Sequence, residues 1–430
     1  MTVSKGAVFP TRNDLFVGKI SKRQDSLEVL SCSFFALAII RSAQSSLFKG
    51  AIQLVQSLAS ATGGADDKMP VDKLVPCPTR QITKRPVFDP FTPGMNYQSF
   101  AEQLRTVVSD IDRVPQYEIR RLFETFDVDN DGKLNKTECE AFNRVVINEV
   151  NKLNCAIIVV DFQNDFVNGS LAIKKGPAMQ DPHEALVPLN KLLRECSFDL
   201  VVYTQDWHPP NHISFYEHCR NGDRAMLPMD KGRKLKPFDT VNFGQPKCHQ
   251  ILYPAHCLQN SWGAELSPHL ARVPDAKYVR KGLNVFVDAY SAFSDNNGEN
   301  KSELARLLRS EGIDALFICG LAYEICVAAT TREANNLGFY AALVADCSKG
   351  LNAEKIDEAN VELSQRNVAI IESQAVESFT TERKVPWRWV CQLAGISGTE
   401  LTVPRGVNGV ENLEGDSTTP SIEVNDGIKV

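Results

Sequence analysis

The chain has 430 residues, of which 43% are hydrophobic and 23% are charged, as in ordinary globular proteins. Its formal net charge of −6 at pH 7 argues against a nucleic-acid-binding protein, which would carry a basic stripe on its surface. The apolar runs are all shorter than the roughly 20 residues that a membrane-spanning helix needs, so we expect no membrane span.

Residues 1–95 are predicted to form an N-terminal extension and linker that is partly disordered. Residues 1–60 are mildly basic and rich in serine, and residues 61–95 are rich in Gly, Pro and Lys. A poorly structured extension or a short docking helix is the preferred interpretation, and a targeting segment is the alternative. The twelve cysteines are scattered, which favours free thiols in a reducing compartment. We therefore expect a cytoplasmic protein, with the nucleus or an organelle as alternatives that depend on the extension.

Residues 96–152 are predicted to form a small helical module around a calcium-binding loop. The twelve-residue calcium pattern takes its ligands from fixed positions, which are occupied here by Asp127, Asp129, Asp131, Lys133 (through its carbonyl oxygen) and Glu138. Gly132 permits the sharp turn at position six, and helical patterns flank the loop. The segment resembles an EF-hand, so we expect it to bind Ca²⁺. The alternative is an acidic turn between two helices, and the sequence contains no second intact loop to pair with this one.

From residue 153 to residue 397, short apolar strands alternate with amphipathic helices. The strand candidates cover residues 156–160, 200–204, 277–280, 315–319, 341–345 and 368–372. This alternation predicts an α/β fold with three αβα layers and a mostly parallel six-stranded sheet, preceded by the small helical domain. Ligands of such sheets bind at the carboxyl ends of the strands. Residues 398–430 are acidic and lack periodicity, so we predict a disordered tail.

Three chemically different side chains follow three of these predicted strands. Asp161 ends the first, Lys281 lies just beyond another, and Cys326 lies a few residues past a third, at the start of a helix. Each alone would be unremarkable, as a capping aspartate, a solvated lysine or a buried thiol. If the strands are neighbours, however, the side chains converge at one edge of the sheet. A thiol, a carboxylate that takes its proton and a cation that holds the geometry are the groups needed for acyl transfer through a thioester.

A second group of candidates has the composition of a metal site. Asp206 and His208 are one residue apart after a predicted strand, and His256 follows later in the chain. Mixed nitrogen and oxygen donors of this kind suit Zn²⁺, and also Fe²⁺ or Mn²⁺. Two prolines stiffen the loop between His208 and His212, which would fix both rings in place.

The region from about 154 to 390 resembles the nicotinamidases of the isochorismatase-like hydrolase superfamily. The matching motifs, in the family's order, are VVDFQNDF, YTQDWHPPNHISF, YPAHC, RKG, DAYSAF and GLAYEICV. The resemblance implies that the chain hydrolyses nicotinamide to nicotinate and ammonia through a cysteine thioester, in NAD salvage. The sequence departs from the family at AYEIC (322–326), where many bacterial members have ATDxC, and at Tyr253, where Trp is common.

The resemblance also implies a role for each matching position. The implied roles are Cys326 as nucleophile, Asp161 as proton shuttle and Lys281 as third member; the backbone amides of Ala322 and Cys326 as oxyanion donors; Asp206, His208, His256 and in some members His212 as metal ligands; and Phe166, Tyr253 and Tyr290 as contacts to the pyridine ring. In the family, the peptide bond between Leu321 and Ala322 is cis.

Two other functions stay open at this point. One is a different amidohydrolase, such as a ureido- or carbamoyl-hydrolase, although these relatives generally lack the Asp–x–His pair with its downstream histidine. The other is a calcium-responsive scaffold with an inactive hydrolase domain, against which the complete Asp, Lys and Cys set argues. Residues 216–250 are predicted to be an insertion that forms a lid or a subunit contact, so a homo-oligomer is one expectation. We also hypothesise that calcium modestly changes the rate, although a purely structural role is favoured.

Overall fold

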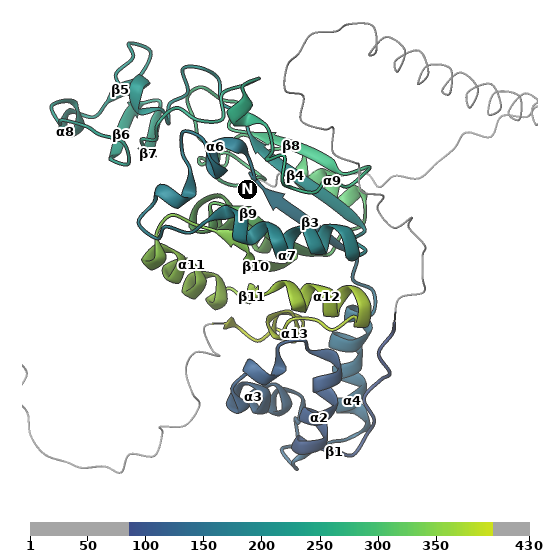
Figure 1. The fold of residues 1–430 in the computed structure, drawn as a ribbon. Coiled ribbons are helices and arrows are strands. Elements are labelled where there is room, and N and C mark those ends of the chain that lie inside the picture. The colour runs from purple at the N-terminus through teal and green to yellow at the C-terminus, as the bar shows by residue number, and fades with distance from the viewer. Residues whose placement is uncertain (1–85, 399–430) are drawn as a thin grey trace, which may run out of the picture. The chain divides into compact units, whose positions relative to one another are not determined.

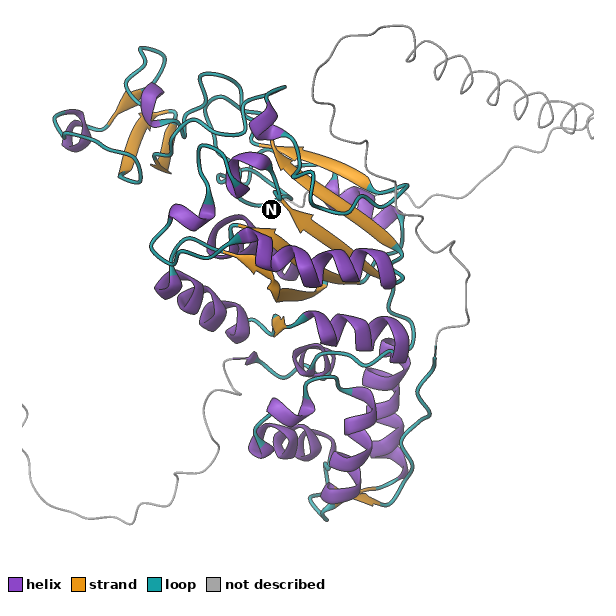
Figure 2. Ribbon diagram, viewed as in Figure 1, coloured by secondary structure: helices purple, strands orange, loops and turns teal. Residues whose placement is uncertain are grey.

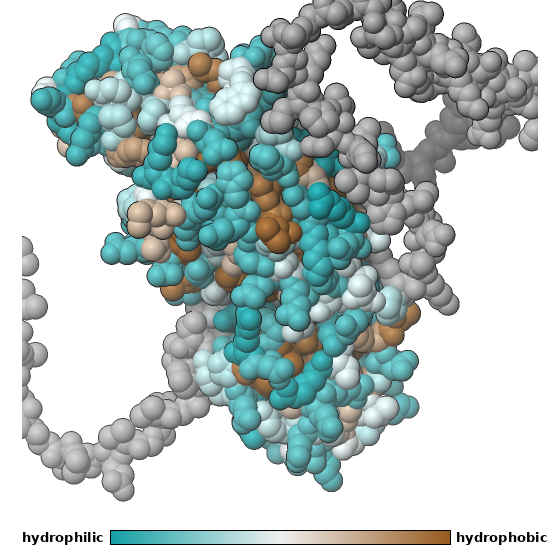
Figure 3. Space-filling model, in the orientation of Figure 1, coloured by the Kyte–Doolittle hydropathy of each residue, from teal (hydrophilic) through white to brown (hydrophobic). Residues whose placement is uncertain are grey.

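The computed structural model describes residues 86–398. The predictions made for residues 1–85 and 399–430 lie outside the described residues. Within the described part, no helix is long and apolar enough to cross a lipid bilayer. Figure 3 shows a face that is mostly hydrophilic, with small and separate hydrophobic patches. Isolated apolar side chains of this kind are ordinary on protein surfaces.

A six-stranded parallel sheet forms the centre of the hydrolase region (Figure 1). In spatial order, its strands are β11 (Ala369–Ile371), β10 (Tyr340–Lys349), β9 (Ala315–Leu321), β3 (Cys155–Val160), β4 (Leu200–Asp206) and β8 (Lys277–Lys281). All six predicted strands are present, so the predicted three-layer fold with a parallel sheet is confirmed. The chain runs outward from β3 to β4 and β8 and then returns to β9 on the other side of β3. The strand order therefore reverses between β3 and β9, where such sheets open a crevice for ligands.

Helices cover both faces of the sheet because successive strand residues point to opposite sides (Figure 2). On one face Ile157 and Phe317 belong to a core shared with α7, α12 and α13. On the other face Ile158 and Ile318 belong to a core shared with α9, α10 and α11. These helices are α7 (Pro182–Glu195), α9 (Leu304–Ser310), α10 (Ala328–Asn336), α11 (Ala353–Gln365), α12 (Ser373–Glu382) and α13 (Trp387–Leu393). The two cores together fix the sheet between its helical layers.

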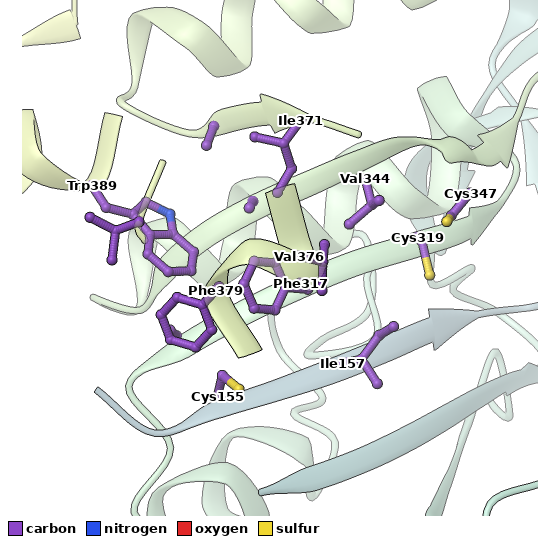
Figure 4. Packing of buried hydrophobic residues seen from close by; sticks show 14 of the residues in the cluster. Cys155, Ile157, Phe317, Cys319, Val344, Cys347, Ile371, Val376, Phe379 and Trp389 are labelled. Atoms are coloured by element: carbon purple, nitrogen blue, oxygen red, sulfur yellow. The ribbon is translucent and has the colours of Figure 1, made fainter. Parts of the chain in front are cut away.

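Aromatic side chains concentrate in the first of these cores. The ring of Phe317 lies 5.3 Å from the ring of Phe379 and 5.3 Å from that of Trp389, as centroid distances. Figure 4 shows these three rings together beside the sheet. Burying one such side chain contributes about 1.5–3 kcal/mol, so this cluster is a major source of stability for the strands that carry the site.

The chain before the sheet forms the predicted helix–loop–helix. Helix α3 (Gln116–Phe126) precedes the loop and α4 (Lys136–Phe142) follows it. Asn135 caps α4: its side chain accepts from the Glu138 amide, and the Glu138 side chain accepts from the Asn135 amide. The other elements are β1 (Met95–Asn96), α2 (Tyr97–Val107), β2 (Lys133–Leu134), α5 (Asn148–Val150), a 3₁₀ turn (Ile111–Arg113) and a π-helical segment (Asn143–Ile147). β1 pairs with β2 in antiparallel orientation, so the segment before α2 braces the loop.

The helical region packs against the carboxyl-terminal part of the described chain. The indole N–H of Trp387 donates to the buried Glu118 carboxylate at 2.7 Å, and the Trp387 backbone amide donates to Asp110 at 2.7 Å. The Val385 amide donates to the Val107 carbonyl at 2.8 Å. Helix α13, which Trp387 begins, thereby links the helical region to the sheet.

The predicted insertion forms a small sheet of its own. Its three strands are antiparallel, in the order β5 (Ala225–Met226), β6 (Thr240–Gln245) and β7 (Lys247–Ile251), with α8 (Pro228–Lys231) between the first two. Buried side chains such as Val241 and Phe243 give it a separate hydrophobic cluster. The role of this insertion as a lid or subunit contact stays a prediction.

The short remaining helices of the described chain are α6 (Asn164–Val167) and the turns Ile173–Lys175, Tyr216–His218 and Trp262–Ala264.

Candidate active site and metal-binding groups

Cys326 lies just beyond the carboxyl end of β9, next to the point where the strand order reverses. The Leu321–Ala322 peptide bond is cis, as the resemblance implies. It leads into a π-helical turn (Tyr323–Val327) that carries Cys326 and continues into α10. Ala322 caps this turn, because its carbonyl accepts from the amides of Ile325 and Val327 at 3.1 Å each. The two predicted oxyanion donors, the amides of Ala322 and Cys326, thus belong to one short turn.

Lys281 joins the predicted catalytic groups into one buried network. Its ammonium group donates to Asp206 Oδ1 at 2.6 Å, to the Ala289 carbonyl at 2.8 Å and to Cys326 Sγ at 3.4 Å. Its Nζ also lies 2.8 Å from Asp161 Oδ2. The structure therefore brings Asp161, Lys281 and Cys326 together, from the ends of three strands, as their sequence positions predict.

Asp161 is held through both of its carboxylate oxygens. Oδ1 accepts the Thr204 hydroxyl at 2.6 Å, while the Asp161 amide donates to the same hydroxyl at 3.2 Å. Oδ2 is buried and forms an ion pair with the Lys281 ammonium at 2.8 Å. Oxygen atoms of Asp161 and Asp206 and the Cys326 sulfur all lie within 4.8 Å of one another. Asp161 Oδ2 is therefore a proton acceptor close to the thiol.

Burial and charge separate the pKa values of the four groups. Burial raises the pKa of Asp161 to about 6, against the opposing charge of Lys281. Burial would also raise the pKa of Asp206, but Lys281 and then His208 outweigh it and lower that pKa below its usual value. Burial would lower the pKa of Lys281, but the two carboxylates raise it well above its usual value. For Cys326, burial raises the pKa well above the usual value despite Lys281, so the resting group is a thiol.

The predicted metal ligands also converge. Donor atoms of Asp206, His208 and His256 lie within 4.8 Å of one another, and all three side chains are buried. His208 Nδ1 faces the Gly282 carbonyl at 3.0 Å, and His256 Nδ1 faces the Pro254 carbonyl at 2.8 Å. A carbonyl beside Nδ1 fixes the ring proton on Nδ1. It leaves Nε2 unprotonated, so that its lone pair can bind a metal, which is the usual arrangement of a metal-binding histidine.

His212 lies against this group from the other side. Its ring stacks on that of His208 with 4.1 Å between centroids, and its Nδ1 bonds to the Ser214 hydroxyl at 2.7 Å. Its Nε2 is buried, with no hydrogen-bond partner among the described residues. A buried imidazole nitrogen without a partner fits the donor set of a divalent metal. Donor atoms of His208, His212 and Asp288 also lie within 4.8 Å of one another.

A pocket opens onto the catalytic and metal groups. Cys326, Ala322, Asp206 and His256 line it on one side. Its walls also include the three predicted ring contacts, Phe166, Tyr253 and Tyr290. The aromatic lining suits a flat, small aromatic ring beside the sulfur and the metal ligands.

The sequence predictions omitted two residues of this site. Thr204 lies in strand β4 and is the second residue of the YTQDWHPPNHISF motif, which was the available signal. Asp288 opens the DAYSAF motif and is buried beside the histidines, where it accepts from Gln250 at 2.9 Å and from the Ala289 amide at 2.8 Å. Its place in a matched motif could have identified it.

The acidic loop brings three of its five predicted ligands together. Oxygen atoms of Asp127, Asp129 and Asp131 lie within 4.8 Å of one another, and Asp127 Oδ1 is buried without a hydrogen-bond partner in the described chain. Glu138 instead accepts from backbone amides, at 2.8 Å from Val128 and at 2.9 Å from Asn135. Lys133 lies in β2, paired with Asn96.

Comparison with known proteins gives consistent matches. The model of the isochorismatase domain matches residues 155–375. The nicotinamidase of Acinetobacter baylyi is 36% identical over 200 residues, which are 46% of this chain and 83% of that protein. The nicotinamidase of Escherichia coli is 36% identical over 208 residues, 48% of this chain and 87% of that protein. The solved structure of the yeast nicotinamidase Pnc1p has 29% identity and a TM-score of 0.43, and covers 51% of this chain and 99% of that one.

Proposed function

The chain belongs to the isochorismatase domain family, and on that premise we propose that it is a nicotinamidase. It hydrolyses nicotinamide to nicotinate and ammonia, and its product enters NAD salvage. The observation that carries the proposal is the Lys281 ammonium between Asp161 and Cys326, next to a pocket lined by Phe166, Tyr253 and Tyr290. The similarity to nicotinamidases at 36% identity supports the choice of substrate. It also disfavours another amidohydrolase or an inactive scaffold.

The first half of the reaction forms the thioester. Asp161, ionised above pH 6, accepts the proton of the Cys326 thiol, and the sulfur attacks the carboxamide carbon. Lys281 holds both groups and stabilises the thiolate. The amides of Ala322 and Cys326 donate to the oxyanion that develops on the carbonyl oxygen. Asp161 then returns the proton to the amide nitrogen, the C–N bond breaks and ammonia leaves.

The second half releases the acid. Asp161 takes a proton from a water molecule, whose oxygen attacks the thioester carbon. The C–S bond breaks, the proton returns to sulfur, and nicotinic acid departs and loses its proton to solvent as nicotinate. Phe166, Tyr253 and Tyr290 would keep the ring in place through both halves, and their burial would exclude other water.

The hydrolase site is proposed to hold a divalent ion, Zn²⁺ or else Fe²⁺ or Mn²⁺. Asp206, His208 and His256 would be its ligands, with His212 as a fourth, as the free Nε2 of His212 supports. When bound, the ion would orient and polarise the pyridine ring through the ring nitrogen. Lys281 donates to Asp206 at 2.6 Å, so the chain itself ties the metal group to the catalytic group.

Residues 96–152 are proposed to be a calcium-binding EF-hand module, followed by the hydrolase domain at 153–397. Ca²⁺ would be held by Asp127, Asp129, Asp131, the Lys133 carbonyl and Glu138. The unpartnered, buried oxygen of Asp127 supports a cation in the loop. Glu138 would have to release its backbone amides in order to reach the ion. The ten free cysteines of the described chain support a cytoplasmic location.

Ammonia release from nicotinamide by the purified, metal-loaded chain tests the proposed function. We expect turnover by the wild type, and loss of turnover in Cys326→Ala with the thermal unfolding midpoint retained. A matched control is Cys391→Ala, which removes a buried thiol far from the pocket lining and is expected to keep the activity. A folded wild type that releases no ammonia would contradict the proposal.

A further inference from the structure

The reaction pocket adjoins a larger groove, and Leu351 lies at the boundary between them. The groove has a volume of about 910 Å³. Pocket and groove share five lining residues, which are Leu171, Tyr253, Tyr290, Ile325 and Leu351. The position of these side chains decides whether the pocket ends as a wall or opens into the groove. A ring with an extra substituent could enter only if the wall yields.

Leu351 lies in a short turn between β10 and α11, at 350–352. Polar contacts from other segments hold this turn. Glu324 Oε1 accepts from the amides of Leu351 and Asn352 at 2.9 and 2.8 Å. Gln180 accepts from the Gly350 amide at 2.7 Å. The Leu351 wall is thus positioned by a carboxylate on the turn that carries Cys326.

The surroundings of Glu324 leave it little freedom. Its Oε2 is buried and has no hydrogen-bond partner in the described residues. Gly350 packs directly on it, since a Cβ at that position would overlap Oε2. Burial raises the pKa of Glu324, as expected for a carboxylate in such a place. The next residue toward the amino end, Tyr323, donates its hydroxyl to Asn360 of α11 at 2.6 Å.

We propose that Glu324 and Tyr323 act as a specificity clamp: they hold the 350–360 segment against the nucleophile turn, so that Leu351 closes the pocket around an unsubstituted pyridine ring. This inference rests on the proposed function and names what limits the substrate. Neither side chain touches the reacting atoms, so both are positioning residues. They are also the two positions at which the chain departs from the ATDxC pattern.

The test compares nicotinamide with nicotinamide that carries a methyl group on ring carbon 5, which is not adjacent to the ring nitrogen. Glu324→Ala and Leu351→Ala are each expected to reduce the preference for nicotinamide, as a ratio of kcat/KM values, by about ten-fold. The change should come from KM, because the wall moves while the sulfur, Asp161 and Lys281 stay in place. Tyr323→Phe, which removes only one hydroxyl, is expected to act in the same direction and carries the test if Glu324→Ala does not fold.

Two control variants separate positioning from charge. Glu324→Gln keeps a carbonyl oxygen for the two amides and should behave like the wild type. Glu358→Ala removes a carboxylate that lines the groove but pairs with Lys355, and it should leave the preference unchanged. Because Glu324 acts through Leu351, the double variant Glu324→Ala/Leu351→Ala should lose no more preference than either single variant.

Unchanged preference in an active Glu324→Ala and Tyr323→Phe would overturn the clamp, and so would fully additive losses in the double variant. These outcomes differ from failure of the proposed function, which would appear as a wild type that hydrolyses none of these amides.

Discussion

At the scale of single residues, the site depends on which group holds the proton. Lys281 donates to Asp206, Ala289 and Cys326 and forms an ion pair with Asp161 Oδ2 at 2.8 Å, so its charge lies beside both the proton acceptor and the thiol. The same burial that raises the pKa of Asp161 to about 6 keeps Cys326 as a thiol. The thiol therefore keeps its proton until a substrate binds, and the transfer of that proton to the carboxylate needs an ionised Asp161.

The rate of nicotinamide hydrolysis should thus rise with pH through about 6. Below that pKa Asp161 is protonated and cannot accept the thiol proton, so kcat/KM should fall about ten-fold per pH unit. Thr204→Val removes the hydroxyl that stabilises the ionised carboxylate, so the midpoint should move upward. Thr204→Ser keeps the hydroxyl and should retain the wild-type midpoint. A profile that stays flat through pH 6, or a downward shift in Thr204→Val, would contradict this role of Asp161.

At the scale of elements, the turn after β8 positions a ligand that follows β4. Gly282 has a left-handed backbone, with φ of +68°, and a Cβ there would overlap the His208 ring. Its carbonyl also fixes His208 Nδ1 at 3.0 Å. The two strands, which are neighbours in the sheet, thereby set one metal ligand together.

Gly282→Ala should therefore lower metal affinity by about 10- to 100-fold, as loss of a supporting contact typically does. Elemental analysis of the purified chain and competition with a chelator measure this without an activity assay. Gly338→Ala is the matched control, because Gly338 is also left-handed, at φ of +88°, but has no neighbour where the Cβ would lie. Equal metal content in the wild type and both variants would contradict the assignment of His208.

The elements also mark what the sequence could predict. Apolar runs such as 156–160 and 315–319 predict strands, and their polar ends predict Asp161 and Cys326 at one edge. Strand order is not encoded in such runs, so the adjacency of β3 and β9 was only a condition of the predicted convergence. The turn at 350–352 lacks any periodic signal, and Glu324 meets it only after about 25 residues of intervening chain have folded back. Leu351 could therefore not be predicted.

At the scale of the whole described chain, the two proposed ion sites lie at opposite ends of the sheet. Catalytic and metal residues follow the carboxyl ends of the strands. The helical region instead leads into β3 at Cys155, and α13, on which it packs, bonds through Trp389 to Ala341 near the start of β10. A strand of six residues spans about 20 Å, so a structural change at the calcium loop would have to be transmitted through the length of the sheet to reach the catalytic residues.

Calcium should accordingly stabilise the protein without changing its chemistry. Added Ca²⁺ should raise the thermal unfolding midpoint, because binding to the folded state stabilises it. The values of kcat and KM should stay within about two-fold, because the network around Lys281 is not touched. Glu138→Gln should abolish the thermal shift, whereas Asp112→Asn, an exposed acid outside the loop, should keep it. A larger change in kcat on calcium addition would favour regulation instead.

The most direct test of the account is to trap the acyl-enzyme. After rapid mixing with nicotinamide and acid quenching, mass spectrometry of the digested protein should find one nicotinoyl group on the peptide that contains Cys326, labile to hydroxylamine. The adduct should be absent from Cys326→Ala. An active wild type in which no adduct forms under any quench time, or in which the group is attached to another residue, would contradict the thioester mechanism.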